Sequence, residues 1–184
     1  MVRALALIVL LAATLVPVAC SGGRSAPDFA LQSDRSTPWN LSEQRGKAVL
    51  LTFGFTHCAD TCPAILARLA HATASLGTRA GNVEIAFVTV DPSRDTPPVL
   101  HRFVNRFAQP GVDIVGLTGT PSQIAATETA YHVWSAKVHA RKGGYDVAHS
   151  AAIFVIDPNG RFHDVLDDED NEGTVVAALR KALG

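Results

Sequence analysis

The run Ala-Val-Leu-Leu-Thr-Phe at residues 48–53 is apolar at every position except Thr52. A strand with one face in water alternates apolar and polar residues, whereas a continuous apolar run is typical of a strand that is buried on both faces. Such a strand requires packed structure on each side of its sheet. The run therefore predicts a layered fold in which residues 48–53 form a central strand.

The rest of the chain alternates between strand and helix patterns. The segments 84–90 and 113–117 are typical of strands. Apolar residues at helical spacing follow Pro63 and Pro97, and Thr120-Pro121 opens another predicted helix. The other predicted elements are a short hairpin within 29–41, strands at 134–140 and 151–156 joined by the loop 141–145, a segment at 161–166, and a last helix from Asn171. This order predicts an α/β fold with a central β-sheet flanked by helices in three layers.

Residues 1–20 have the pattern of an export leader. Arg3 precedes an uncharged, mainly apolar stretch that ends near Cys20, as in a secretory signal. The position of Cys20 after Ala19 resembles a bacterial lipoprotein signal, in which Cys20 becomes the acylated first residue. The alternatives are cleavage by an ordinary signal peptidase and retention as a membrane anchor, although the stretch barely reaches the ~20 apolar residues that span a bilayer. All three place the domain outside the cytoplasm.

The composition of the remainder limits its function. Residues 21–27 are predicted to be a flexible tether, and residues 28–184 to form one domain with a sizeable core. The chain has a net charge of −1 and no basic block, so nothing recommends nucleic acid as a partner. A domain of this size does not need a disulfide for stability, and its cysteines are therefore expected to be functional.

Cys58 and Cys62 lie between the central strand and the helix that opens at Pro63. The positive end of the helix dipole should stabilise thiolates there and lower their pKa. A structural disulfide is disfavoured because closing so short a loop contributes only ~2 kcal/mol. Two adjacent thiolates can bind a soft metal or cycle between dithiol and disulfide. The spacing of three residues favours a chelating loop, but spacing alone leaves both possibilities open.

His149 is the best candidate for a third ligand. A strand, a loop with two cysteines, a helix and a closing hairpin resemble the thioredoxin-like arrangement. In such a sheet the loop before the last core strand approaches the start of the first helix, and His149 immediately precedes the strand at 151–156. Two thiolates and one imidazole suit Cu(I), and an added oxygen ligand would allow Cu(II). Structural zinc is disfavoured because it normally takes four protein ligands.

The other histidines and two aspartates receive simpler interpretations. His57 adjoins Cys58 but points away from it if the backbone there is extended. Asp91 and Asp95 are expected to shape a turn and to help cap the helix at Pro97, with a docking or accessory metal surface as the alternative. Five histidines show no partner spacing and are not expected to bind metal: His71, His101, His132, His139 and His163.

In combination, these motifs resemble the Sco/SenC family of copper-binding thioredoxin-like proteins. The resemblance rests on Gly54–Pro63 with its two cysteines, Val90–Pro97, His149–Ser150 and Ile156–Gly160, in this order. It covers about residues 28–184. Members of that family bind copper through two cysteines and a histidine and deliver it to the binuclear copper centre of cytochrome c oxidase.

The resemblance implies that Cys58, Cys62 and His149 are copper ligands. It also implies an exported, membrane-tethered copper chaperone whose partner is the copper-accepting subunit of cytochrome c oxidase. Ala59 and Ala148 depart from the family pattern, since many members have Pro and Asp at these positions. Loss of an acidic neighbour would alter the orientation of the histidine or the affinity for Cu(II), without removing a ligand.

Two enzymatic functions are alternatives. Cys58 and Cys62 also suit the redox pair of a thiol–disulfide oxidoreductase, which would reduce cysteines of the copper acceptor through a mixed disulfide. That function predicts reductase activity without copper and tolerance of the loss of His149. A peroxidase would need an activating Arg and Thr around a single attacking thiolate, and the sequence makes neither evident.

Overall fold

The apolar run forms strand β3 (Ala48–Gly54), in which every residue is buried. The computed structural model describes residues 23–140 and 143–184. In these residues β3 belongs to a seven-stranded sheet, parallel to β4 (Val83–Thr89), and β4 is parallel to β5 (Asp113–Thr118). The sheet order is β2-β1-β5-β4-β3-β8-β9, and its outer strands run antiparallel to their neighbours: β1 (Ala30–Ser33), β2 (Pro38–Asn40), β8 (Ile153–Ile156) and β9 (Phe162–Leu166).

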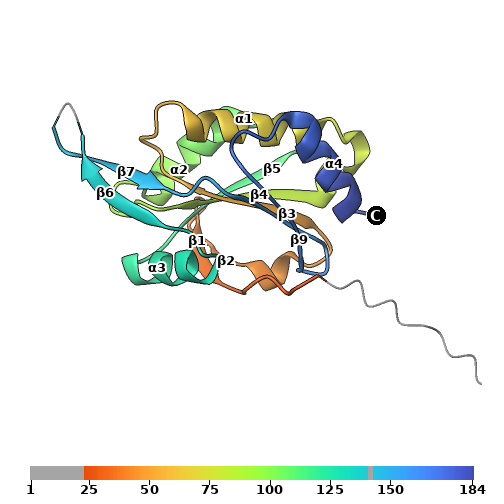
Figure 1. Ribbon diagram of the computed structural model, residues 1–184, viewed down its shortest axis with the longest axis horizontal. Coiled ribbons are helices and arrows are strands. Elements are labelled where there is room, and N and C mark those ends of the chain that lie inside the picture. Colours follow the sequence, from red (N-terminus) through yellow and green to blue (C-terminus); the bar gives the residue numbers. More distant parts are fainter. Residues whose placement is uncertain (1–22, 141–142) are drawn as a thin grey trace, which may run out of the picture.

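Helices cover both faces of the sheet (Figure 1). One face carries α1 (Thr61–Ala74), α2 (Pro97–Val104) and α4 (Glu172–Ala182), and the opposite face carries α3 (Pro121–Ala130). Short 3-10 helices occur in the connections of the described residues: η1 (Leu41–Gln44), η2 (Gly77–Asn82) and η3 (Asn105–Phe107). The predicted α/β fold, a central sheet between helical layers, is confirmed.

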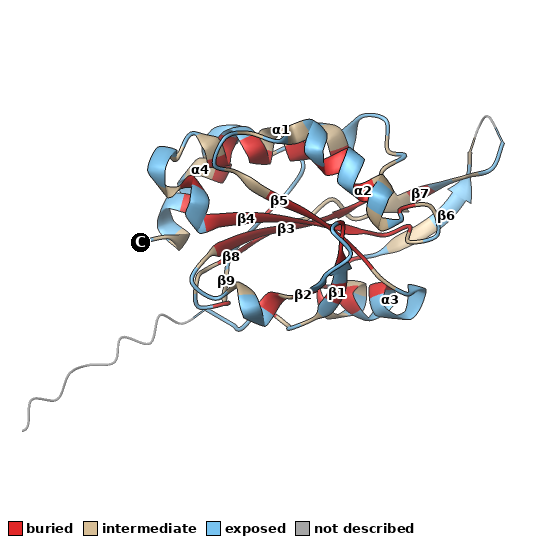
Figure 2. Cartoon of the chain, turned by 180° about the vertical axis from the view of Figure 1, so that it is seen from behind, coloured by how far each residue is buried: buried red, intermediate tan, exposed pale blue. Residues whose placement is uncertain are grey.

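The core lies on both sides of the central strands, and Figure 2 shows β3 and β4 buried throughout. The side that faces α3 is aromatic. The ring centroid of Tyr131 lies 6.0 Å from that of Phe53 and 5.2 Å from that of Phe154. Burial of one large apolar side chain contributes about 1.5–3 kcal/mol. This packing fixes the neighbouring strands β3 and β8, and the candidate site lies beside them.

A separate two-stranded sheet contains β6 (Ser135–His139) and β7 (Tyr145–His149). The predicted pairing of 134–140 with 151–156 is therefore wrong, because β6 pairs with β7 and β8 pairs with β3. The strand β7 escapes sequence prediction because it is short, its central Val147 lies between an acidic and a small residue, and it ends in a polar residue. The hairpin of β6 and β7 extends from the body of the molecule (Figure 1).

The predicted helix starts are close to those observed. Helix α3 begins after Thr120, whose side chain accepts a hydrogen bond from the Gln123 amide, while the Gln123 side chain accepts one from the Thr120 amide. Helix α4 begins after Asn171, whose side chain also caps the helix. Thr96 is the N-cap residue of α2, but its side chain forms no capping hydrogen bond. Local capping chemistry thus explains two of these three starts.

The predicted tether comprises residues 21–27, and its described part, from residue 23 on, is attached to the domain. The Phe162 amide donates a hydrogen bond to the Arg24 carbonyl at 2.9 Å, and the Ala26 amide donates to the Gly160 carbonyl at 3.0 Å. Ala26 is also buried. These contacts occupy backbone groups beside β9, an edge strand whose outer side is not paired with another strand of the sheet.

The predicted leader, residues 1–20, lies outside the described residues together with its candidate lipidation site, Cys20. The assignment of this segment as a lipoprotein signal stays a prediction. Within the ranges 23–140 and 143–184, the helices are too short or too polar for any of them to cross a bilayer.

Candidate functional site

The two candidate cysteines follow the C-terminal end of β3, where the chain turns into α1. The Cys58 amide donates a hydrogen bond to the Phe55 carbonyl at 3.3 Å, which closes a tight turn. Helix α1 begins at Thr61, slightly before the predicted Pro63, and Cys62 therefore lies in its first turn. Both thiols are free; Cys62 is buried and Cys58 is partly exposed. The more accessible sulfur is that of Cys58.

The start of α1 stabilises the thiolate form of Cys58. A hydrogen bond from the Cys62 thiol lowers the pKa of Cys58 to about 6; burial opposes this shift, and the backbone amides of Cys62, Asp60 and Thr61 add to it. The Cys62 amide lies 3.3 Å from Cys58 Sγ. The neighbouring Cys58 sulfur and burial raise the pKa of Cys62. The pair therefore holds one thiolate, on Cys58, and one thiol near neutral pH.

His149 is the last residue of β7, whereas the sequence predicts a loop there. Its Nε2 atom lies 3.8 Å from Cys62 Sγ, and its Nδ1 atom lies 2.8 Å from the Ser150 carbonyl oxygen. Because a carbonyl only accepts hydrogen bonds, Nδ1 carries the proton of the neutral ring and Nε2 keeps a free lone pair. The ring packs edge-on against Phe55, with 5.8 Å between the centroids. The imidazole is thus in the tautomer that can bind a metal through Nε2.

A groove of about 460 Å³ is lined by residues of the cysteine loop and of β7, the strand that carries His149. Cys58, His149 and the exposed Trp134 all line it. The structure brings Cys58 to Cys62 and Cys62 to His149. Across the described ranges, however, no group of three or more His, Cys, Asp or Glu residues is placed to hold a metal ion. A three-ligand site therefore requires a side chain to reorient at the groove.

Two of the other histidines have carboxylate neighbours instead of sulfur. His57 turns toward Asp95, with 3.9 Å between Nδ1 and a carboxylate oxygen, which agrees with its exclusion as a ligand. His101 has a partner that its sequence spacing does not reveal, since its Nδ1 lies 2.7 Å from an oxygen of Asp34. Asp34 itself is buried and accepts the Gly116 amide. This pair connects α2 to the sheet.

Asp95 holds the cysteine loop to the core, a role that sequence alone does not reveal. Its fully buried carboxylate accepts hydrogen bonds from the Thr56 amide at 3.0 Å and from the Thr56 and Thr89 hydroxyls at 2.6 Å each. The prediction that Asp95 caps a helix is wrong, because its side chain faces Thr56 and Thr89 rather than the amides of α2. Asp95 therefore joins the loop after β3 to the end of β4.

Asp91 is the centre of a second buried network. Its carbonyl accepts the amides of Arg94 and Asp95, which confirms the predicted turn, but its side chain caps no helix. Its carboxylate pairs with Arg94 Nε and accepts the Tyr145 hydroxyl at 2.9 Å. The Arg94 guanidinium stacks 4.0 Å from the centroid of the Tyr145 ring and donates to the Tyr145 carbonyl at 3.1 Å. Since Tyr145 begins β7, this network attaches the hairpin that carries His149.

Gly54 allows β3 to pass directly against the site. A Cβ atom at this position would lie 2.7 Å from the Phe87 ring and 2.9 Å from Cys62 Sγ, closer than real Cβ atoms approach other atoms. The sequence contains the signal for this contact, because a glycine at the end of an apolar strand often marks a close backbone approach. Ala59 and Ala148, the two departures from the family pattern, both line the groove.

The SCO1/SenC family model matches residues 20–184 of the chain. The mitochondrial SCO2 homolog of Bos taurus is 39% identical over 159 residues, which are 85% of this chain and 59% of the relative. The mitochondrial SCO1 homolog 1 of Arabidopsis thaliana is 36% identical over 165 residues, which are 84% of this chain and 48% of the relative. The chain thus spans about half to three fifths of the length of these relatives.

Solved structures of Sco proteins have a similar fold. Arabidopsis thaliana ScoI with copper bound has a TM-score of 0.78 and 30% identity, and the match covers 85% of this chain and 96% of that one. Bradyrhizobium japonicum ScoI with copper bound has a TM-score of 0.77 and 31% identity, with 86% and 99% covered. Apo Sco1 from Thermus thermophilus has a TM-score of 0.76 and 36% identity, with 89% and 94% covered.

Proposed function

Because the chain belongs to the SCO1/SenC family, we propose that it is an exported copper chaperone with Cys58, Cys62 and His149 as its copper ligands. It delivers the metal to the binuclear copper site of cytochrome c oxidase, through the subunit that accepts copper. The observation that carries the proposal is the approach of His149 Nε2 to within 3.8 Å of Cys62 Sγ, beside a second sulfur. Two similar structures with copper bound support the choice of metal.

The donor atoms fit copper chemically. Two sulfurs and one imidazole nitrogen are ligands that Cu(I) prefers, and the Nδ1–H bond to Ser150 leaves Nε2 available. Copper binds thiolates rather than thiols, so uptake releases the proton that Cys62 still holds. Affinity is therefore expected to fall as the pH decreases.

Copper leaves by ligand exchange. A thiol of the acceptor gives up its proton and bonds to copper as the bond between copper and Cys58 breaks, and the released Cys58 sulfur can take up a proton. The oxidation state of the metal does not change. Cys58 is the ligand expected to exchange first, because its sulfur is the more exposed of the two.

Anaerobic titration of the reduced protein with Cu(I), and separately with Cu(II), tests the ligand set. A Cys20→Ser background leaves Cys58 and Cys62 as the sole sources of thiolate. We expect one copper per chain, with thiolate-to-copper absorption for Cu(II) that His149→Ala destroys. Exposed His163, changed to Ala, serves as the matched control. Unchanged binding of both copper ions by the His149→Ala variant would refute the three-ligand site.

A second candidate function is thiol–disulfide exchange with the copper acceptor. It is favoured by the partly exposed Cys58, with a pKa of about 6, beside the buried Cys62 thiol. The Cys58 thiolate attacks an acceptor disulfide and displaces one sulfur, and Cys62 then resolves the mixed disulfide after losing its proton. The acceptor gains two electrons as Cys58 and Cys62 become oxidised to a disulfide, and its two sulfurs take up the proton that Cys62 loses and one proton from solvent.

Reductase activity without copper separates the two functions. The oxidoreductase reduces a model disulfide stoichiometrically in the metal-free state and continues to do so after His149→Ala. Absence of reduction in the wild-type protein, together with stoichiometric copper binding, would leave the chaperone as the function.

We also propose that the leader exports the chain and that lipidation at Cys20 holds it on the extracytoplasmic side of a membrane. The Ala19-Cys20-Ser21 sequence and the preceding apolar stretch support this proposal. Mass spectrometry of the membrane fraction should detect an acylated N-terminal Cys20. In the Cys20→Ser variant the lipid should be absent, and detection of an unmodified Cys20 in the mature wild-type protein would contradict the proposal.

A further inference from the structure

The groove continues onto an apolar face of the hairpin. Trp134, which precedes β6, is 58% exposed and Val138 is 43% exposed; in the described chain, Val165 is the one other large hydrophobic residue of comparable exposure. The Trp134 carbonyl accepts the Ser150 amide, which extends the pairing of β6 with β7. Alternate residues of a strand share a face, so Trp134 and Val138 lie on the same side of β6. An exposed apolar strip therefore begins at the site.

The alanine at position 148 lengthens this strip. Ala148 pairs with Ala136, which lies between Trp134 and Val138 in the alternation of β6. Both alanines are partly exposed, and Ala148 also lines the groove. The outer face of the hairpin is defined here by Trp134, Ala136, Val138 and Ala148. These four side chains are apolar, and Asp146, which pairs with Val138, lies beside them on the same face.

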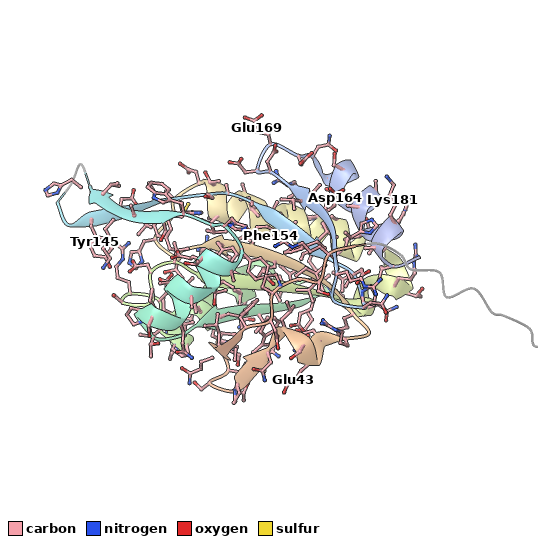
Figure 3. All side chains as sticks on the ribbon, turned by 60° about the horizontal axis from the view of Figure 1, so that its bottom comes forward. Glu43, Tyr145, Phe154, Asp164, Glu169 and Lys181 are labelled. Atoms are coloured by element: carbon pink, nitrogen blue, oxygen red, sulfur yellow. The ribbon has the colours of Figure 1, made fainter. Side chains whose placement is uncertain are left out.

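Acidic residues border the same groove. Asp60, Asp146 and Asp168 line it, and its lining contains neither Lys nor Arg. Asp168 belongs to the acidic run 167–170 between β9 and α4, and Figure 3 shows Glu169 of this run projecting into solvent. Within residues 23–140 and 143–184, none of these carboxylates forms an ion pair. Within the described ranges the rim of the groove is thus negatively charged, and Arg68 beside it donates to the Asp168 carbonyl rather than to a carboxylate of the rim.

We propose that the groove and the outer face of the hairpin form the docking surface for the copper acceptor. The acceptor is inferred to present its thiols next to an apolar side chain and positive charge. This inference rests on the proposed chaperone function. Ligand exchange requires an acceptor thiol to reach Cys58, and Trp134 lines the same groove; an approaching partner is therefore brought onto the strip. Buried aromatic side chains dominate many interfaces, and unpaired carboxylates select a basic partner.

A second copy of this chain does not fit the surface equally well. A two-fold contact between two copies would place the same patch on both sides of the interface. The acidic rim of one copy, with Asp60, Asp146 and Asp168, would then face an identical rim, and like charges oppose such a contact. A basic partner removes this repulsion.

Copper transfer to synthetic peptides tests the surface. The full chain in detergent is loaded with one Cu(I) per molecule and mixed with a peptide that carries two cysteines three residues apart, one leucine and three lysines. A matched peptide has glutamates instead of lysines. We expect a second-order rate constant about tenfold higher for the lysine peptide at low salt. This difference should shrink as ionic strength rises, because salt screens exposed charges.

Surface variants locate the contact. Trp134→Ser should lower the rate constant for the lysine peptide about tenfold, in line with the loss of an aromatic anchor, and Val138→Ser about threefold. Val165→Ser is the matched control, because Val165 is exposed to 56% but lies on β9, and it should leave the rate unchanged. The double variant Asp146→Asn, Asp168→Asn should slow the lysine peptide about threefold at low salt. Its control is Glu43→Gln. Figure 3 shows Glu43 far from Glu169, which belongs to the same acidic run as Asp168.

The outcomes separate docking from the proposed function. One copper per chain with equal transfer rates for Trp134→Ser, Val165→Ser and the wild type would overturn the docking surface and leave the chaperone intact. Faster transfer to the glutamate peptide would overturn the basic partner. A dimer of the wild-type chain that Trp134→Ser dissociates would show that the face binds a second copy, and would also overturn the proposal.

Failure to bind copper would instead refute the proposed function. The docking surface is then tested with the metal-free protein and the lysine peptide by calorimetry. Binding that Trp134→Ser weakens about tenfold would support the surface independently of copper, whereas absence of binding would overturn it.

Discussion

The two halves of the site are held in different ways. Cys58 and Cys62 follow a wholly buried strand and lead into a helix that covers the sheet, whereas His149 ends a hairpin outside the seven-stranded sheet. Figure 2 shows this contrast, with buried central strands and a hairpin of mainly intermediate and exposed residues. A two-stranded hairpin is at best marginally stable alone in water. The position of His149 therefore depends on the contacts at the base of its hairpin.

Those contacts are few and specific. Arg94 and Asp91 hold Tyr145, and the Phe55 ring packs against His149. The Arg94 guanidinium also lies 5.9 Å from the Phe55 ring centroid, so it connects the hairpin to the cysteine loop. We infer from this difference that changes in the cysteine half mainly lower the free energy of unfolding. Changes at the hairpin base mainly disturb coordination by the imidazole.

The largest effect is expected from Asp95→Ala in the cysteine half. The substitution leaves the Thr56 amide and the hydroxyls of Thr56 and Thr89 without their buried acceptor. Each unsatisfied buried donor costs about 1–3 kcal/mol, so we expect unfolding in denaturant to reveal a loss of roughly 3–5 kcal/mol in total. Asp95→Asn retains one carbonyl oxygen as acceptor and should lose less. A loss for Asp95→Ala below about 1 kcal/mol would contradict the anchoring role.

Gly54→Ala should have the next largest effect. The added methyl group meets the Phe87 ring and Cys62 Sγ, and overpacking of this kind typically costs about 1–3 kcal/mol. We expect a lower melting temperature together with weaker copper binding, because Cys62 must move. Gly81→Ala is the control, since no atom lies within 4 Å of a Cβ atom there. Equal melting temperatures for both variants would show that β3 tolerates the side chain.

The sequence predicts the cysteine half better than the histidine half, for a physical reason. The apolar run of β3 and the helix start near Pro63 are local patterns, and they place Cys58 and Cys62 at one junction. The partners of Asp95 and Arg94 come from other segments, as in the bond from Arg94 to the Tyr145 carbonyl. Such contacts depend on how elements pack, and sequence spacing carries no record of them.

The sequence between β6 and β7 does contain a local signal for a hairpin. Gly143 and Gly144 have φ values of 89° and 78°, the left-handed backbone that tight hairpin turns require. Two consecutive glycines between 135–139 and 145–149 therefore favour a hairpin of these two segments over the predicted pairing of 134–140 with 151–156. The sequence predicts His149 as a neighbour of the cysteines only through its position before the last core strand, and its Nε2 lies 3.8 Å from Cys62 Sγ. Its tautomer depends on the Ser150 carbonyl and required the structure.

Tyr145→Phe tests the base of the hairpin that carries His149, and its effect on stability should be smaller than that of Asp95→Ala or Gly54→Ala. It keeps the ring on which Arg94 stacks but removes the hydroxyl that donates to Asp91, at a cost of about 1 kcal/mol. We expect the Cu(II) spectrum to change because His149 is less well positioned. Tyr131→Phe is the control, since its hydroxyl donates to the Pro27 carbonyl in the core. It should lower stability by about as much with an unchanged spectrum, and identical spectra for both variants would refute the positioning role.

The smallest effect on stability is expected at the partly exposed Cys58 sulfur. This prediction concerns its reactivity, which is measured as the pH dependence of alkylation. The pKa of Cys58 is lowered to about 6, and only the thiolate reacts with iodoacetamide. In a metal-free Cys20→Ser chain, alkylation of Cys58 should accelerate as the pH rises through about 6 and then level off. In Cys62→Ala the main hydrogen bond to the thiolate is lost, so the midpoint should move to higher pH. A midpoint near 9.0 in both proteins, or faster alkylation of Cys62 than of Cys58, would show that the buried thiol does not stabilise the exposed thiolate.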